Sequence, residues 1–263
     1  MSSPAARKQG KYATKIGGKH DAPSVTTIVG MLDKPGLSWG AAKETALFAN
    51  HHQDEWLHLD EIAAYERLRK HHKGVWDDKA LRGTMVHDFA EQWAAGKEVD
   101  CPIECVGYLD ALAAFYADHE PEWLQVERTV IYDEQPGLEY AGTFDGIAKL
   151  KDGTTALIDL KSGKRYPVET TLQLAAYRYA THMGIYDDMG TLVDSEPLPI
   201  IDRSCVLYLH DDGAYELLEL EADYPTFQIF LALRQVWNWK RIAEAWEKAN
   251  KEQLTYAKKA DVA

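Results

Sequence analysis

Residues 140–161 read YAGTFDGIAKLKDGTTALIDLK, and this stretch decides the fold of the chain. Two apolar runs, residues 141–150 and 154–160, flank Lys151-Asp152-Gly153. An Asp-Gly pair between two strand-like runs is a strong short-range signal for a β-hairpin. We therefore expect Asp145 and Asp159 to lie on adjacent strands.

Two charged residues interrupt the second run at a spacing of two. Leu157, Ile158 and Leu160 are apolar and β-prone, whereas Asp159 and Lys161 are charged. Side chains alternate across a strand, so this carboxylate and this ammonium project from one face. Burying them costs several kcal/mol unless they are paired or bind a metal. The pair is either a salt bridge at the rim of the strand or part of a functional site.

A second carboxylate is expected beside this pair. Asp145 follows Gly142-Thr143-Phe144 in a run that otherwise predicts a continuous strand. Two neighbouring carboxylates supply the hard oxygen ligands that Mg²⁺ and Mn²⁺ prefer. Beside such an ion, Lys161 could orient or help to deprotonate an attacking water, or stabilise the charge that builds on phosphorus.

These residues belong to an ordered set of four motifs. In chain order the motifs are Gly83-x-x-x-His87, Gly142-x-x-Asp145, Asp159-x-Lys161 and Gln173-x-x-x-Tyr177. The set resembles the PD-(D/E)XK nuclease superfamily. It fits best the RecB-like branch, which includes CRISPR-associated exonucleases and related phage and mitochondrial enzymes.

The resemblance implies a metal site and a set of catalytic residues. The implied metal ligands are His87, Asp145, Asp159 and the carbonyl of Leu160. The implied catalytic residues are Asp145, Asp159, Lys161 and Glu127, the last resembling an acid that many RecB-like members carry near the metal. Without the resemblance, His87 is a hydrogen-bonded boundary residue beside the apolar stripe of its helix, and Glu127 pairs with Arg128 or another base.

Five further residues are candidates for contacting the substrate: Gln173, Tyr177, Arg82, Lys164 and Arg165. Gln173 and Tyr177 are four residues apart on a predicted helix and so share a face. The resemblance assigns that face to the active site, where the two would support Lys161 or contact DNA; otherwise Tyr177 is a core residue. Lys164 and Arg165 either position a phosphate or belong to a solvated basic turn.

The order of predicted elements indicates a mixed α/β fold of the α+β type. Predicted helices span 24–32, 37–50, 57–72, 78–95, 104–119, 168–183 and 223–250. Predicted strands span 124–132, the hairpin 141–160 and a second hairpin, 203–210 with 215–219; residues 184–199 are expected to be a polar, mobile loop. The resemblance implies a restriction-endonuclease-like core with a small central mixed sheet flanked by helices, preceded by an N-terminal helical lobe.

Four segments are expected along the chain. They are a disordered basic arm at 1–22, the helical lobe at 23–76, the nuclease core at 77–250 and a C-terminal tail at 251–263. The last predicted helix carries aromatic residues that either form core or stack on bases. We expect the core role for Phe227, Phe230, Leu231, Val236, Trp237 and Trp246.

The composition is that of a soluble globular protein, with 46% hydrophobic and 27% charged residues. No apolar run approaches the roughly 20 residues that span a membrane, so we expect a cytoplasmic protein, in the host cytoplasm if the source is viral. The net charge of −13 argues against a general polyanion binder. An acidic protein can still hold DNA in a locally basic channel.

Three cysteines, Cys101, Cys105 and Cys205, indicate a reducing compartment and no disulfide framework. Some RecB-like nucleases hold an iron–sulfur cluster through four cysteines, and three cannot supply that set. We therefore expect Mg²⁺ or Mn²⁺ as the cofactor and no iron–sulfur cluster.

The resulting functional expectation is a metal-dependent DNA exonuclease that leaves 5′-phosphate products during recombination, repair or phage DNA processing. Its expected partners are DNA that is single-stranded or has free ends, and recombination or single-strand-binding proteins. Three alternatives stay open: a catalytically inactive DNA-binding or scaffold subunit, an RNA-directed enzyme, and an endonuclease of the same fold.

Overall fold

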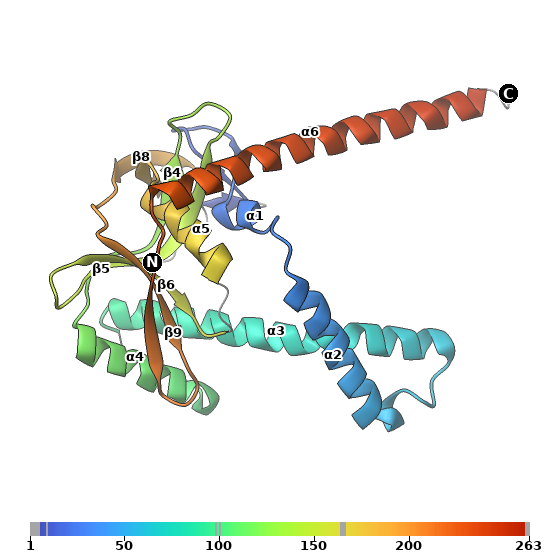
Figure 1. Cartoon of the computed structure of the whole chain (residues 1–263), viewed down its shortest axis with the longest axis horizontal. Coiled ribbons are helices and arrows are strands. Elements are labelled where there is room, and N and C mark those ends of the chain that lie inside the picture. Colours follow the sequence, from blue (N-terminus) through green and yellow to red (C-terminus); the bar gives the residue numbers. More distant parts are fainter. Residues whose placement is uncertain (1–5, 9, 98, 100, 164–166, 261–263) are drawn as a thin grey trace.

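A seven-stranded mixed sheet forms the core of the molecule, on the left in Figure 1. The computed structural model describes residues 6–8, 10–97, 99, 101–163 and 167–260, without the side chains of 78, 79 and 252–260. The strands of this sheet are β4 (Glu122–Tyr132), β5 (Tyr140–Lys149), β6 (Thr155–Lys161), β7 (His182–Tyr186), β8 (Leu192–Pro197), β9 (Arg203–Leu209) and β10 (Tyr215–Leu220). The helices are α1 (Val25–Val29), α2 (Pro35–His51), α3 (Glu61–Ala94), α4 (Val106–His119), α5 (Pro167–Arg178) and α6 (Tyr224–Ala260), with short 3-10 turns at Gln53–Glu55 and Ile103–Cys105.

The strand order is β10-β9-β6-β5-β4-β7-β8. The β6–β9 pair is parallel and the other neighbouring pairs are antiparallel. This confirms the mixed α/β fold with a central mixed sheet flanked by helices, as a restriction-endonuclease-like core requires. The sheet is larger than expected because residues 182–197, predicted to be partly a polar mobile loop, form the β7–β8 hairpin.

The β5–β6 hairpin forms as the Asp-Gly signal predicts. Gly153 has a φ of +86°, a conformation that glycine adopts at little cost, and the Leu150 amide donates to the Thr154 carbonyl at 2.9 Å. The two strands pair from Lys149↔Thr155 to Gly146↔Ile158. Asp145 and Asp159 are the next residues beyond the last pair, so the two strands stop pairing and separate at the two carboxylates.

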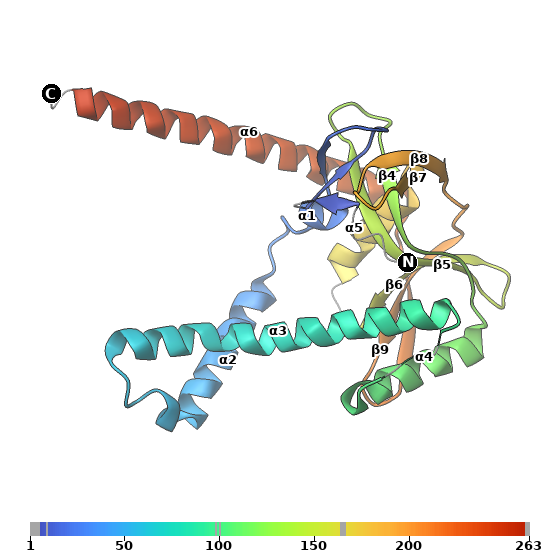
Figure 2. The same cartoon turned by 180° about the vertical axis from the view of Figure 1, so that it is seen from behind.

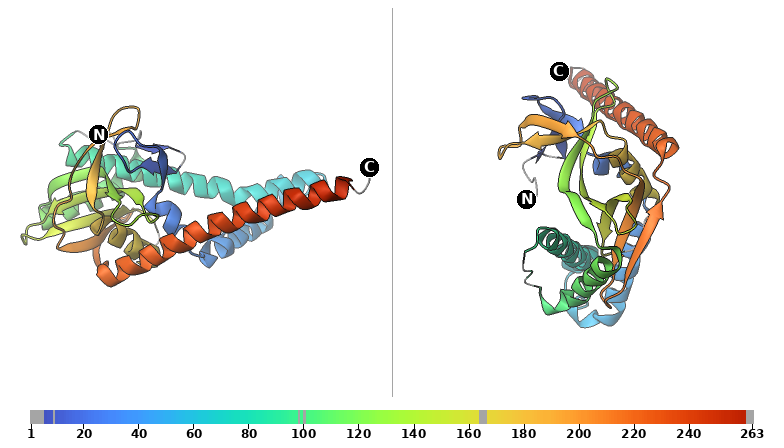
Figure 3. Two further views of the ribbon diagram at one scale, coloured as in Figure 1. Left: turned by 90° about the horizontal axis from the view of Figure 1, so that it is seen from above. Right: turned by 90° about the vertical axis from the view of Figure 1, so that its left-hand side faces the viewer.

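Helices cover both faces of the sheet (Figure 3). On one face, α1, α5 and the start of α6 bury Ile28, Leu174 and Phe230 against the sheet. On the other face, the second half of α3 packs with α4, and Phe89 and Phe115 belong to that cluster. Because Leu157 belongs to the first cluster and Ile158 to the second, the alternation along β6 places apolar side chains in both cores.

The expected disordered arm is wrong for the described part of residues 1–22. β1 (Arg7–Lys8), β2 (Lys11–Ala13) and β3 (His20–Pro23) form a separate three-stranded antiparallel sheet. This N-terminal sheet is held by burial rather than by local strand propensity. Ala6, Tyr12 and Ala13 pack against Ile131, Ala141 and Leu192 of the central sheet.

The N-terminal helical lobe consists of α2 and the first half of α3, and it projects away from the sheet (Figure 2). The two helices predicted at 57–72 and 78–95 are one continuous helix, α3. Gly74, which lies between them, costs only about 1 kcal/mol in a helix interior and does not break it. The expected boundary between lobe and core at 76–77 therefore falls inside a helix.

The C-terminal helix α6 is longer than predicted and continues past residue 250, where a tail was expected. It leaves the core after its first turns (Figure 1). Phe227, Phe230 and Leu231 are buried as expected and Trp237 is half-buried, but Val236 and Trp246 are exposed. The prediction that all six side chains form core is therefore wrong for those after Leu231, because no described element packs over the outer part of the helix.

Gly107 near the start of α4 offers a test of the packing. A Cβ atom at this position would overlap the backbone carbonyl oxygen of Asp211 in the β9–β10 turn. We expect Gly107→Ala to lower the free energy of unfolding by about 3 kcal/mol or more, measured by urea denaturation. Gly74→Ala is the matched control: a Cβ there meets nothing, so this variant should be about 1 kcal/mol more stable. Equal stabilities of the two variants would contradict this packing.

Candidate active site

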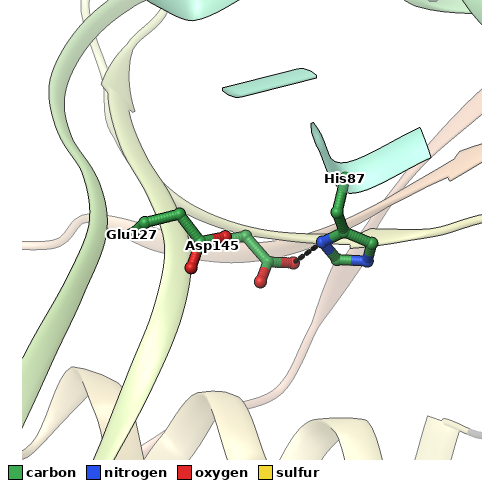
Figure 4. A group of neighbouring side chains, drawn as sticks. All are labelled: His87, Glu127 and Asp145. Atoms are coloured by element: carbon green, nitrogen blue, oxygen red, sulfur yellow. Dashed lines mark ion pairs between the residues drawn. The ribbon is translucent and has the colours of Figure 1, made fainter. Parts of the chain in front are cut away.

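Three potential metal ligands from three different elements converge on one point (Figure 4). His87 comes from α3, Glu127 from β4 and Asp145 from β5. One ligand atom of each lies within 4.8 Å of the others, and all three side chains are partly exposed. The β4–β5 register, with Val126 opposite Gly146 and Arg128 opposite Phe144, places Glu127 across from Asp145.

The side chain of Asp145 lies where β5 and β6 stop pairing, and contacts with β6 and α3 fix its position. Its Oδ2 accepts a hydrogen bond from the Leu160 amide at 2.6 Å, and the same oxygen lies 3.7 Å from Nδ1 of His87. A backbone N–H of β6 is therefore paired with the side chain of Asp145 rather than with the backbone of β5. The predicted ligands His87 and Asp145 and the backbone of Leu160 are thus adjacent.

Asp159, Lys161 and Gln173 form a second group beside the first. Lys161 Nζ lies 2.5 Å from Asp159 Oδ2, and Gln173 Nε2 donates to Asp159 Oδ1 at 3.0 Å. Asp159 is only 2% exposed, whereas the side chain of Lys161 is 33% exposed. The pair is therefore not a rim salt bridge: the carboxylate is buried and holds an ammonium that reaches the surface.

The charges of this group are set by burial and by neighbouring carboxylates. Burial and the nearby Asp145 raise the pKa of Asp159, against the opposing effect of Lys161. Burial alone would lower the pKa of Lys161, but Asp159 and Asp145 together raise it above its ordinary value. This direction favours the charged form of Lys161, which can act as a cation or hydrogen-bond donor.

Glu127 is held in an unfavourable backbone conformation. Its φ is +49°, in the left-handed region that costs a residue with a side chain roughly 1–2 kcal/mol. The alternative role as the partner of Arg128 is wrong, because Arg128 pairs with Glu196 on β8. Burial, and to a smaller extent the carboxylates of Asp145, Glu91 and Asp88, together raise the pKa of Glu127 to about 8.

A cleft of about 450 Å³ opens in front of these groups. It is lined by Gly83, Thr84, His87, Asp88, Glu91, Glu127, Lys161, Ser162 and Gly163. The sequence did not single out Asp88 and Glu91 as site residues. Their signal is the helical spacing, since Glu91 lies one turn after His87 on α3.

The structure separates the predicted substrate-contacting residues. Gln173 reaches the site through Asp159. Tyr177, on α5, is 2% exposed and belongs to the hydrophobic core. The prediction that it contacts DNA is therefore wrong, and the alternative prediction of a core residue is correct. Arg82 is exposed on α3 beside the cleft but does not line it. Lys164 and Arg165 lie outside the described residues.

The donor set fits a divalent cation. One imidazole and several carboxylates suit Mg²⁺ or Mn²⁺, which take oxygen ligands. Burial, and in addition the repulsion from the Asp145, Glu91 and Asp88 carboxylates, disfavours a charged Glu127. A bound cation would relieve this repulsion, and His87, Glu127 and Asp145 are the residues placed to hold it.

Replacing Glu127 with glutamine tests this repulsion in the metal-free protein. The folded-state pKa of about 8 lies above the unfolded value, so the native state is stabilised relative to the unfolded state at low pH and loses this advantage as pH rises toward 8. We expect Glu127→Gln in chelator to raise the melting temperature at pH 8–9 and to leave it little changed at pH 5. A wild-type melting temperature with the same pH profile as that of the variant would contradict the raised pKa.

Comparison with known proteins agrees with this geometry. The sequence model of the family described as "PD-(D/E)XK nuclease superfamily" matches residues 46–199, more than half of the chain. No protein of curated function matches the sequence. Solved structures that match include one described as "Crystal structure of SSO0001", with 14% identity and a TM-score of 0.30 over 49% of this chain and 55% of that chain, a likeness too weak to carry an argument. No helix of the described residues has the length and apolar character needed to cross a membrane. From the family match, the chain belongs to the PD-(D/E)XK nuclease superfamily.

Proposed function

We propose that this nuclease is a metal-dependent DNA exonuclease of the RecB-like branch that leaves 5′-phosphate products. The single observation that carries the proposal is the convergence of His87, Glu127 and Asp145 within 4.8 Å beside the Asp159–Lys161 pair. The order of the four motifs supports the branch, because Gly83-x-x-x-His87 precedes the two carboxylate motifs. Recombination, repair and phage DNA processing are the contexts that fit this chemistry, with single-strand-binding or recombination proteins as partners.

His87, Glu127 and Asp145, with the carbonyl of Leu160, would hold the Mg²⁺ or Mn²⁺ ion. Asp159 is a further proposed ligand, although its contacts with Lys161 and Gln173 support a positioning role as well. When bound, such an ion supplies Lewis-acid activation of the scissile phosphate and a more acidic attacking water.

The residues of the chain supply orientation and charge. The attacking water gives up a proton to solvent and forms a new bond to phosphorus while the bond from phosphorus to the 3′ oxygen breaks. The departing 3′ oxygen takes up a proton, which leaves a 3′-hydroxyl and a 5′-phosphate. Lys161 carries a fixed positive charge at the edge of the cleft, where it can donate a hydrogen bond to the water or to a phosphate oxygen. Asp159 holds the ammonium in place, and Gln173 holds Asp159.

A cleavage assay tests the proposal. Labelled single-stranded and duplex DNA, each linear and circular, is incubated with the full chain and Mg²⁺, Mn²⁺ or chelator. We expect metal-dependent loss of linear DNA, intact circles and products that carry a 5′-phosphate. Cut circles would instead establish an endonuclease, exclusive cleavage of a matched RNA would establish an RNA-directed enzyme, and binding without cleavage would establish an inactive subunit.

A further inference from the structure

A second cavity, which the proposed chemistry does not use, lies at the start of β5. Its volume is about 320 Å³. It forms where the β2–β3 loop, the β4–β5 loop and α6 meet, and we call it the anion pocket. The residues that define it are Lys15, Lys19, Asp21, Glu139, Arg234 and Asn238.

Arg234 is a buried cation at the base of the pocket. It is 5% exposed, its Nε donates to the Glu139 carbonyl at 3.1 Å, and its Nη1 donates to Asn238 Oδ1. Its guanidinium also stacks on the ring of Trp237 at 4.8 Å. Among the described residues no carboxylate oxygen lies within 4.0 Å of its guanidinium. Burial lowers the pKa of Arg234, and the nearby Glu139 carboxylate opposes this effect only in part. A buried charge that is only partly compensated is costly, so an anion in the adjacent cavity would stabilise it.

Two exposed lysines add to the charge of the pocket. Lys15 and Lys19 lie on the β2–β3 loop, which is shaped by a tight turn. The Gly18 amide donates to the Lys15 carbonyl at 2.7 Å, and the Gly17 amide donates to the Leu192 carbonyl of β8 at 3.0 Å. The loop is therefore anchored to the central sheet with both lysines at the rim of the pocket.

The opposing acids do not cancel this charge. Asp21 and Glu139 are the carboxylates that line the cavity, against three cations. The Glu139 carboxylate, which accepts a hydrogen bond from the Gly137 amide at 2.9 Å, offsets one of these cations. The pocket is thus locally positive in a chain whose net charge is −13.

We propose that the anion pocket binds a backbone phosphate of the nucleic-acid strand that the active site cleaves, an inference that rests on the proposed function. The N-terminal sheet connects the two places: the Tyr12 hydroxyl lies 3.2 Å from Thr143 Oγ1, two residues before Asp145 on β5. Glu139 precedes Asp145 by six residues, a distance of about 20 Å along an extended strand. A strand held at both points would be fixed in direction, because phosphate contacts set register and orientation without reading bases.

The test is strand binding in chelator, where no turnover occurs. Anisotropy of a labelled single-stranded oligonucleotide is measured over a range of salt concentrations for wild type, Lys15→Ala/Lys19→Ala and the control Lys149→Ala/Lys248→Ala. Both double variants remove two exposed lysines, but the control pair lies outside the pocket. We expect about tenfold weaker binding for the pocket variant and a salt slope smaller by about 0.7 for each lost phosphate contact. The control should bind within about twofold of wild type.

Two further arms make the result decisive. Arg234→Gln, with its fold checked by circular dichroism, should weaken binding as the lysine variant does, because the buried cation is lost. Equal affinities of the pocket and control variants would overturn the proposal. A second result would also overturn it: inorganic phosphate or a nucleoside monophosphate raises the melting temperature of wild type but not of the pocket variant, while both proteins bind the oligonucleotide equally. That result would identify a site for small anions. If the wild-type protein binds the strand but does not cleave it under any condition, the proposed nuclease activity is refuted, whereas the proposal that the pocket binds a backbone phosphate is not.

Discussion

Replacing Lys161 with alanine is expected to lower the rate of strand cleavage by about 10²- to 10³-fold, which is typical when one preorganised electrostatic donor is removed. The reason is its position: Lys161 is the cation that Asp159 holds at 2.5 Å and presents at the edge of the cleft. The measurement is the single-turnover rate on end-labelled DNA with saturating Mg²⁺. The exposed Lys149, at the far end of β5, provides the control substitution, and Lys149→Ala should cleave at the wild-type rate.

Loss of stability has to be separated from loss of chemistry in this variant. Lys161→Ala leaves the buried Asp159 without its cation, which should cost about 3 kcal/mol of unfolding free energy. The double variant Lys161→Ala/Asp159→Asn removes the unpaired charge and should regain stability without regaining cleavage. Cleavage by Lys161→Ala within about threefold of wild type would contradict the role of Lys161.

Replacing Asp145 with asparagine should strongly weaken metal binding with little effect on the fold. An asparagine oxygen can still accept the hydrogen bond from the Leu160 amide, so the opening between β5 and β6 keeps its support. The substitution removes a negative charge that attracts the divalent cation. In the wild type, the same charge helps to raise the pKa of Glu127. We expect Mn²⁺ affinity, measured by calorimetry, to fall by about 10²-fold or more and cleavage to fall by about 10³-fold.

The control for this second prediction is Asp188→Asn on the exposed β7–β8 turn, which changes the net charge equally. It should bind Mn²⁺ and cleave as wild type does. The melting temperature of metal-free Asp145→Asn should equal or exceed that of wild type, because a like charge near Glu127 is removed. Unchanged Mn²⁺ affinity in Asp145→Asn would exclude Asp145 as a ligand.

The sequence predicts the central hairpin because its signals are local. The Asp152-Gly153 turn and the apolar runs on either side suffice to pair β5 with β6. Asp159 and Lys161 could be recognised because charges are rare in a buried strand. The N-terminal sheet has no such signal, because its strands are only two to four residues long. They are ordered by the burial of Tyr12 and Ala13 against distant parts of the chain.

Part of the site could not be predicted for the same reason. The resemblance suggests Glu127 as a site residue, but its position across from Asp145 and its left-handed backbone conformation depend on the assembled sheet. Tyr177 shares a helical face with Gln173, but only the packing of α5 shows that it is buried whereas Gln173 reaches Asp159. Glu91 faces the cleft through a helical spacing that many surface helices also show.

The most direct test of the metal site is an anomalous-difference map from crystals of this protein grown with Mn²⁺. We predict a peak between His87, Glu127 and Asp145, with ligand distances of about 2.0–2.2 Å, and no peak there in crystals of Asp145→Asn. Well-ordered side chains of these three residues with no Mn²⁺ between them, or a peak only at another site, would contradict the central claim.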